Sequence, residues 1–162
     1  MRHLLVALSL LICRVAFSDT QPSVGTIAPD VSGGFHMPSY PDLVVVPGTP
    51  VYYAPHVAAN FFFYDSRYWI YQVDGWYASR GYDGPWGFVA PDAVPVQLLR
   101  VPVLYYCQPP SYFRGWLTDA LPRWGEFWGR EWDRRHNGWD RWDRNTVPTP
   151  EPLPAHQPTQ FH

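Results

Sequence analysis

The 162-residue chain contains no lysine and only two cysteines, and 16% of its residues are charged. Its formal net charge of −2 excludes a general attraction to nucleic acid or anionic lipid, so we expect no nucleic-acid partner. No stretch reaches the roughly 18 consecutive apolar residues of a membrane-spanning helix. The motifs G-x-S-x-G, H-E-x-x-H and C-x-x-C and a glycine-rich phosphate loop are missing. We therefore predict no catalytic residue, no cofactor, no metal ligand and no enzymatic activity.

Aromatic residues and prolines are abundant instead. Phe, Tyr and Trp make up 18% of the chain, and there are 19 prolines. Disordered chains have few aromatic residues and high net charge, so this composition indicates a folded core. The length suits one domain with tails.

The N-terminus has the pattern of a secretory signal peptide. A short basic start, Met1–His3, precedes the apolar run Leu4–Cys13, and small residues occupy Ala16 and Ser18. The apolar run is shorter than a transmembrane helix requires. We expect export, with a cut after Ser18.

Neither cysteine indicates a special site. Lipid attachment at Cys13 requires a small preceding residue, and Ile12 is large. Removal of the leader leaves Cys107 alone, so the mature chain cannot form an intrachain disulfide. Because Cys107 follows the apolar run Val101–Tyr106, we expect it to be buried.

Composition divides the chain into five segments. We interpret them as a signal peptide (1–18), an extended N-terminal arm (19–42), an aromatic antiparallel sheet (43–107), a Trp/Arg-rich helical segment (108–144) and a proline-rich disordered tail (145–162).

The aromatic segment has the pattern of a β meander. Asp65-Ser66, Asp74-Gly75 and Asp83-Gly84 recur every nine residues, which allows a five-residue strand and a tight turn each time. We predict strands at 43–46, 51–53, 61–64, 68–72, 76–79 and 86–89. Prolines interrupt residues 90–107, which predicts an edge strand or helical turn followed by a strand at 102–106.

The turn aspartates have an alternative interpretation as acid–base or calcium-binding carboxylates. Each of them occupies a position at which a turn already favours aspartate, so we interpret them as structural. His136 and Asp140 form an isolated pair, which we interpret as solvated.

Strand alternation gives the predicted sheet two apolar faces. Tyr68 and Ile70 would lie on one face and Trp69 and Tyr71 on the other. The second face needs a cover, which could be the C-terminal helix, a partner, a lipid surface or a sugar. Aromatic rings stack well on flat ligands. The candidate glycan-binding platform consists of Trp69, Tyr71, Trp76, Tyr82 and Trp86.

The C-terminal segment carries tryptophans at helical spacing. At 100° per residue they fall within an arc of about 80°. The stripe comprises Trp124, Trp128, Trp132, Trp139 and Trp142. Pro122 places the start of the helix near 120–123, with Asp119 as a candidate cap and a break near Asn137-Gly138.

Three roles compete for this tryptophan stripe. It could pack on the sheet, lie at a membrane interface or stack on nucleic acid. Residues 114–144 contain seven arginines and six acidic residues, so they lack the positive surplus that lipid or phosphate binding needs. We favour packing on the sheet.

Four stretches carry a resemblance to a known group. They are Val51–Pro55, "YWIYQVDGWYASRGYDGPWGFVAP" from Tyr68 and "VPVLYYCQPPSYFRGW" from Val101, with "RWDR" at Arg141–Arg144. Over about two thirds of its length, the chain resembles uncharacterised exported proteins of Gram-negative bacteria. This resemblance implies the periplasm or outer envelope and no particular reaction.

We therefore expect an α+β protein, in which a small antiparallel meander is packed by one Trp-striped C-terminal helix between disordered arms. Its expected function is that of a non-enzymatic cell-envelope structural or interaction module with an envelope protein or glycan as partner. The alternatives are glycan or peptidoglycan binding through exposed aromatic residues, and peripheral membrane contact through the tryptophan helix.

Overall fold

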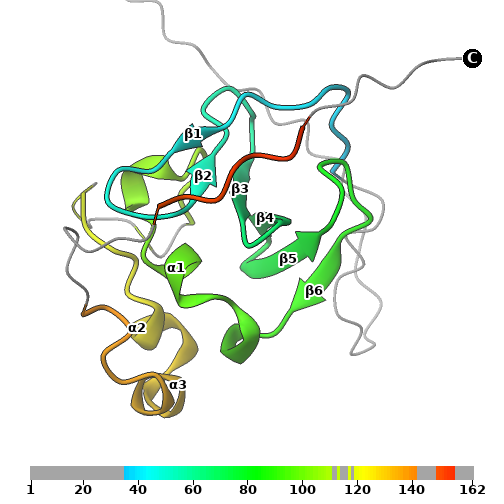
Figure 1. The fold of residues 1–162 in the computed structure, drawn as a ribbon. Helices are drawn as coiled ribbons and strands as arrows, with labels where there is room; N and C mark the ends of the chain where they lie inside the picture. The colour runs from blue at the N-terminus through cyan, green and yellow to red at the C-terminus, as the bar shows by residue number, and fades with distance from the viewer. Residues whose placement is uncertain (1–34, 111–112, 114–116, 118, 142–148, 156–162) are drawn as a thin grey trace, which may run out of the picture.

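The computed structural model describes residues 35–110, 113, 117, 119–141 and 149–155. The expected signal peptide (1–18), most of the expected arm (19–42) and Trp142 lie outside these residues. Within them, six strands form one antiparallel sheet that follows the chain order, as the meander prediction requires (Figure 1). The strands are β1 Val44–Val45, β2 Tyr52–Tyr53, β3 Asn60–Tyr64, β4 Arg67–Gln72, β5 Gly75–Ser79 and β6 Gly87–Val89.

Two tight turns set the register of the central strands. Asp65 and Ser66 both have positive φ, and the Tyr64–Arg67 pair closes the first hairpin. The second turn is formed by Val73 and Asp74 (φ 48° and 56°), one residue earlier than predicted. Gly75 instead opens β5, where a Cβ would approach the Phe88 ring to 3.3 Å. Close packing therefore accounts for this glycine.

The sheet has two apolar faces, as the alternation predicted. Trp69 and Tyr71 belong to one buried cluster, while Tyr68 and Ile70 belong to another. The first cluster also contains Val46, Val51, Phe62, Trp76, Val94, Leu98, Leu99, Val101, Val103, Tyr106, Phe113, Trp124 and Trp132. Both faces are covered by other parts of the same chain.

Short helical segments cover the first face. They are η2 Pro91–Ala93, α1 Val96–Leu99, η3 Val103–Tyr105, α2 Trp124–Trp128 and α3 Arg130–Arg135. The prediction of a strand at 102–106 is wrong, because Val103–Tyr105 forms a 3-10 helix after Pro102. The helical turn predicted before it is present as α1. Cys107 is exposed, contrary to expectation, because it lies beyond the packed residue Tyr106.

The single Trp-striped helix is not confirmed. It is replaced by α2 and α3, which meet at Gly129 with φ 90° and ψ 167°. Asp119 does not cap either helix, because α2 begins after Arg123 and has no side-chain cap. The helices do cover the sheet, however, since the Trp124 side chain is fully buried and Trp132 is 2% exposed.

The second face is covered by both chain ends. Met37 is buried in its cluster, and Phe35, Tyr40 and Leu153 pack against it. The Met37 N–H donates to Asp83 Oδ1 at 2.5 Å, so a predicted turn aspartate also anchors the arm. The described part of the tail, 149–155, lies against the sheet, in contrast to the disordered tail expected from composition. Figure 1 shows it crossing the front of the sheet in red.

Candidate functional site

The predicted aromatic platform is mostly interior. Trp69, Tyr71, Trp76 and Trp86 are buried, and Tyr82 is half-buried. Trp76 packs on Phe62, Tyr71 and Trp124, while the Trp86 ring packs on Phe35 and Phe61. The structure thus corrects the expectation that these five rings present an exposed stacking surface, because the chain ends and helices cover both faces.

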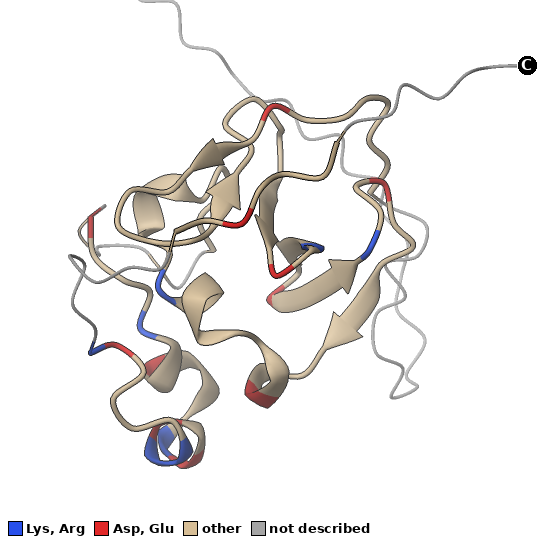
Figure 2. Ribbon diagram, in the orientation of Figure 1, with Lys and Arg blue, Asp and Glu red and all other residues tan. Residues whose placement is uncertain are grey.

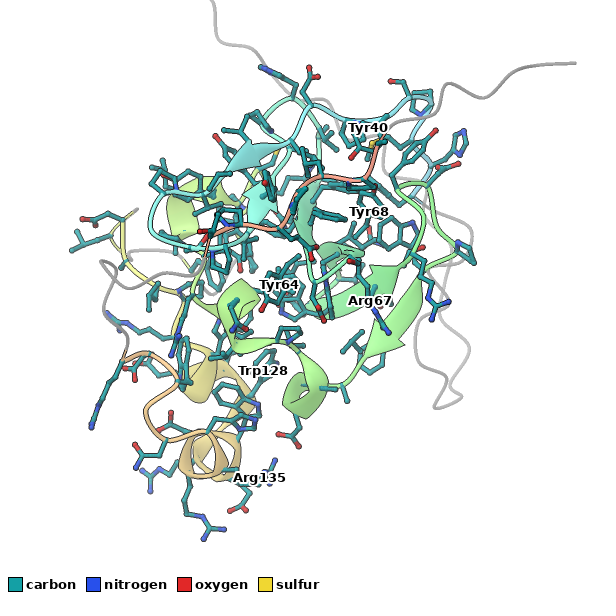
Figure 3. The ribbon with its side chains drawn as sticks, in the orientation of Figure 1. Tyr40, Tyr64, Arg67, Tyr68, Trp128 and Arg135 are labelled. Carbon is teal, nitrogen blue, oxygen red and sulfur yellow. The ribbon has the colours of Figure 1, made fainter. Side chains whose placement is uncertain are left out.

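The tryptophans of the predicted stripe differ in exposure. Trp124 Nε1 donates to the Leu99 carbonyl at 3.1 Å, which ties α2 to α1. Trp128 stacks on Trp124 with ring centroids 4.6 Å apart. Trp128 and Trp139 are only half-buried, and Trp128 lies between α1 and α2 in Figure 3. A stripe predicted for packing thus leaves accessible indole surface at its edge.

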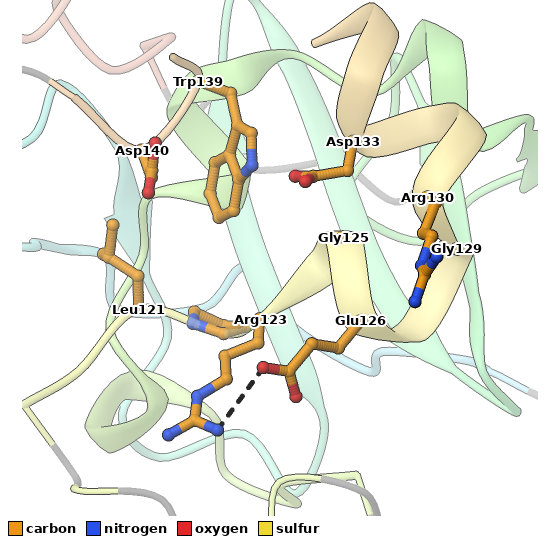
Figure 4. Close-up of a pocket in the computed structure, with 10 residues that line it drawn as sticks. Leu121, Arg123, Gly125, Glu126, Gly129, Arg130, Asp133, Trp139 and Asp140 are labelled. Carbon is orange, nitrogen blue, oxygen red and sulfur yellow. Dashed lines mark hydrogen bonds and ion pairs between the residues drawn. The ribbon is translucent and has the colours of Figure 1, made fainter. Parts of the chain in front are cut away.

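An open cleft of about 650 Å³ lies beside the half-buried Trp139. We call it the α2–α3 cleft. Its lining residues are Leu121, Pro122, Arg123, Gly125, Glu126, Gly129, Arg130, Asp133, Trp139 and Asp140. In Figure 4, Asp133 and Trp139 point toward each other, while the Arg123–Glu126 pair closes another side. The cleft therefore combines an indole surface with polar groups.

Two glycines shape the α2–α3 cleft. At Gly129 the chain turns sharply, which lets α3 fold back beside α2 rather than continue its axis. At Gly125 an added Cβ would lie 2.7 Å from Asp133 Cγ, so only glycine lets that carboxylate lie across α2. The helix-breaking glycines in the tryptophan pattern were the sequence signal for this site. From the sequence we favoured packing on the sheet for Trp139 and a solvated role for Asp140, and we assigned ligand binding to none of the cleft residues.

The cleft contains charges of both signs. The guanidinium groups of Arg123 and Arg130 are present with the carboxylates of Glu126, Asp133 and Asp140. Arg123 Nη1 and Glu126 Oε1 form an exposed pair at 3.5 Å. Figure 2 shows that charged residues gather around α2 and α3, whereas the strands carry few. The cleft therefore offers hydrogen-bond donors and acceptors together.

Arg100 fixes the wall that carries Trp139. Its Nε donates to the Trp139 carbonyl, and its Nη2 donates to the Arg141 carbonyl at 3.4 Å. Burial lowers the pKa of the Arg100 guanidinium, and the nearby Asp140 carboxylate raises it in part. The side chain remains charged because an arginine does not lose its proton in proteins. Arg100 is therefore a positioning residue for the indole.

A second anchor holds α3 against η2. Arg135 Nη2 donates to both Asp92 carboxylate oxygens at 3.0 and 3.1 Å, and Arg135 also pairs with Glu131, one helical turn earlier in α3. The ring of His136 stacks on Trp132 with centroids 4.3 Å apart. Arg135 is the last residue of α3 and is labelled in Figure 3. One wall of the α2–α3 cleft is therefore α3, which is held in place by the buried Trp132 indole and by the Arg135–Asp92 ion pair.

The described residues contain no group of three or more His, Cys, Asp or Glu side chains that could hold a metal ion. In the same part of the chain, no helix has the length and apolar character needed to cross a membrane. The α2–α3 cleft has to be interpreted from its own residues, because comparison with protein-family models, curated proteins and solved structures finds no match to this chain.

Proposed function

We propose that the protein is an exported, non-enzymatic interaction module of the cell envelope and that it binds a glycan in the α2–α3 cleft. The signal-peptide pattern at residues 1–18 supports export. The observation that carries the choice of ligand is the half-buried Trp139 indole beside carboxylate and guanidinium groups in one open cleft.

A sugar fits the chemistry of this cleft. One face of a pyranose ring presents C–H groups that pack on an aromatic plane, and its hydroxyls both donate and accept hydrogen bonds. Asp133 and Asp140 accept from hydroxyls, while Arg130 donates to them. Charges of both signs favour a neutral polar ligand over a strongly charged one, because neither sign dominates the cleft.

The interfacial-helix alternative has less support. A membrane-binding helix needs a continuous apolar stripe that faces outward. Trp124 and Trp132 face the protein core, and Gly129 interrupts the helix between them. The charged groups around α2 and α3 are mixed in sign, which gives no electrostatic attraction to anionic lipid.

A titration with chitotetraose, a neutral β-1,4-linked N-acetylglucosamine tetramer, tests the proposal. We expect binding by isothermal titration calorimetry, and a tenfold or greater loss of affinity in Trp139→Ala, about 1.4 kcal/mol. Asp133→Asn should weaken binding less, because an amide still accepts one hydrogen bond. Soluble peptidoglycan strands provide a second probe, in which β-1,4-linked N-acetylglucosamine alternates with N-acetylmuramic acid.

Matched controls use residues outside the cleft. Phe88→Ala removes an aromatic ring that is 54% exposed, and Asp65→Asn neutralises an exposed turn carboxylate. Both should bind chitotetraose as the wild type does. Unchanged affinity in Trp139→Ala, or absence of binding to both glycans, would contradict the proposed site. Release of shortened sugars by the wild type would contradict the non-enzymatic assignment.

A further inference from the structure

The C-terminal segment 149–155 lies against Tyr52, Ser66 and the cluster of the second face, all remote from it in sequence. We call the surface that it covers, which borders a pocket of about 210 Å³, the groove. We propose that this groove is a recognition site for extended, proline-rich peptides that carry a carboxylate, and that the chain's own segment is its resident occupant. A peptide of the same chemistry from another protein would bind by displacing it. This inference is independent of the glycan proposal.

Specific polar contacts hold the segment in one register. The Tyr52 hydroxyl donates to the Glu151 main-chain carbonyl at 2.9 Å. The Ser66 backbone N–H donates to Glu151 Oε1, and the Ser66 hydroxyl donates to Oε2 at 3.4 Å. The β3–β4 turn, in which Ser66 has positive φ, thus receives the carboxylate at a backbone N–H group. Both the backbone and the acidic side chain of Glu151 are recognised.

The remaining contacts suit a proline-rich backbone. Leu153 packs on the second-face cluster, and Pro152 and Pro154 border a small pocket of about 210 Å³ with Phe63, Tyr68 and Arg80. Prolines at alternate positions restrict each intervening residue to extended geometry, so little conformational entropy is lost on binding. Docking of proline-rich segments on aromatic surfaces is a common mode of peptide recognition. This chain contains both the aromatic surface, on its sheet, and the proline-rich segment, at 149–155.

The resident segment is positioned to be displaced. Pro152, Pro154 and Ala155 are exposed, and Glu151 and Leu153 are only half-buried. Its link to the cleft is short in sequence, from Arg141 to Thr149, so the segment competes as a tethered ligand with an effective concentration of about 1 mM. A free peptide has to compete with this effective concentration in order to bind. Once the segment is released, the groove is exposed.

NMR of the full chain can follow occupancy at the Ser66 amide, because that N–H bonds the Glu151 carboxylate. In the variant Glu151→Ala with Leu153→Ala, we expect the Ser66 proton to shift upfield. Addition of the unlabelled peptide Thr149–Ala155 should return it toward its wild-type position. The same peptide with Glu151→Ala should not. The wild-type chain should need about tenfold more peptide to bind it in trans.

Asp119→Ala serves as the matched control, because it removes an exposed acid outside the groove and should leave the Ser66 amide unchanged. The single variant Glu151→Ala gives the same test if the double variant loses the wild-type circular dichroism spectrum. A Ser66 amide that stays at its variant position in millimolar peptide would overturn the proposal. Equal peptide affinity in the wild type and in the variant Glu151→Ala with Leu153→Ala would also overturn the proposal, since the segment would then not occupy the groove.

Discussion

The junction between α2 and α3 provides a sharp stability test. Gly129 has φ 90° and ψ 167°, a region that is essentially open only to glycine. Among the residues that the structure describes, space does not limit the position, because an added Cβ would meet none of their atoms within 4 Å. Gly129→Ala therefore isolates backbone conformation from packing.

Two responses are open to this variant, and both lower stability. If the backbone is retained, the strain amounts to about 1–3 kcal/mol. If the chain relaxes into one straight helix, alanine gains about 1 kcal/mol of helix propensity. A straight helix, however, withdraws Trp132, which is 2% exposed, and loss of that burial costs about 1.5–3 kcal/mol. We expect the free energy of unfolding to fall by about 1–2 kcal/mol.

Urea denaturation followed by tryptophan fluorescence measures this change. Gly129→Asn is the informative companion, because asparagine tolerates positive φ near ψ +47° but gains nothing at ψ 167°. It should be destabilised like the alanine variant. Wild-type or higher stability in Gly129→Ala would refute the reasoning and would favour the continuous helix that the tryptophan spacing predicts.

Three further predictions follow from buried or closely packed groups. Tyr106→Phe should raise the free energy of unfolding by about 1 kcal/mol at pH 7, because the buried hydroxyl finds no hydrogen-bond partner within the described part of the chain. Burial also raises the pKa of Tyr106, so the wild type should lose stability as the pH rises above about 10, and urea titrations should show the advantage of the variant growing there. Gly125→Ala should displace the Asp133 carboxylate and weaken chitotetraose binding, with stability unchanged or higher by up to about 1 kcal/mol in urea. Arg100→Gln should weaken chitotetraose binding several-fold in calorimetry, because glutamine cannot span the Trp139 and Arg141 carbonyls; unchanged affinity would exclude a positioning role.

Local sequence features were sufficient to predict the sheet. Turn aspartates at nine-residue spacing and alternating aromatic residues place the strands and assign Trp69 and Tyr68 to opposite faces. These features depend on two-residue periodicity and on turn geometry, both of which act between neighbours in the chain. The one-residue error at Gly75 arose because its role is to admit the Phe88 ring from another strand.

The segments that cover the two faces of the sheet could not be predicted in this way, because their positions depend on long-range packing. Helical spacing alone predicts a continuous helix through Trp124 and Trp132, but in the structure both indoles are buried and the chain bends between them at Gly129. Composition alone predicts a solvated tail, whereas Tyr52 in β2 and Ser66 in the β3–β4 turn, both far away in the chain, offer it hydrogen bonds. The sequence by itself therefore determined the meander and its two apolar faces. Only the tertiary structure decided what covers them and where a cleft opens, because those contacts join residues that no local pattern relates.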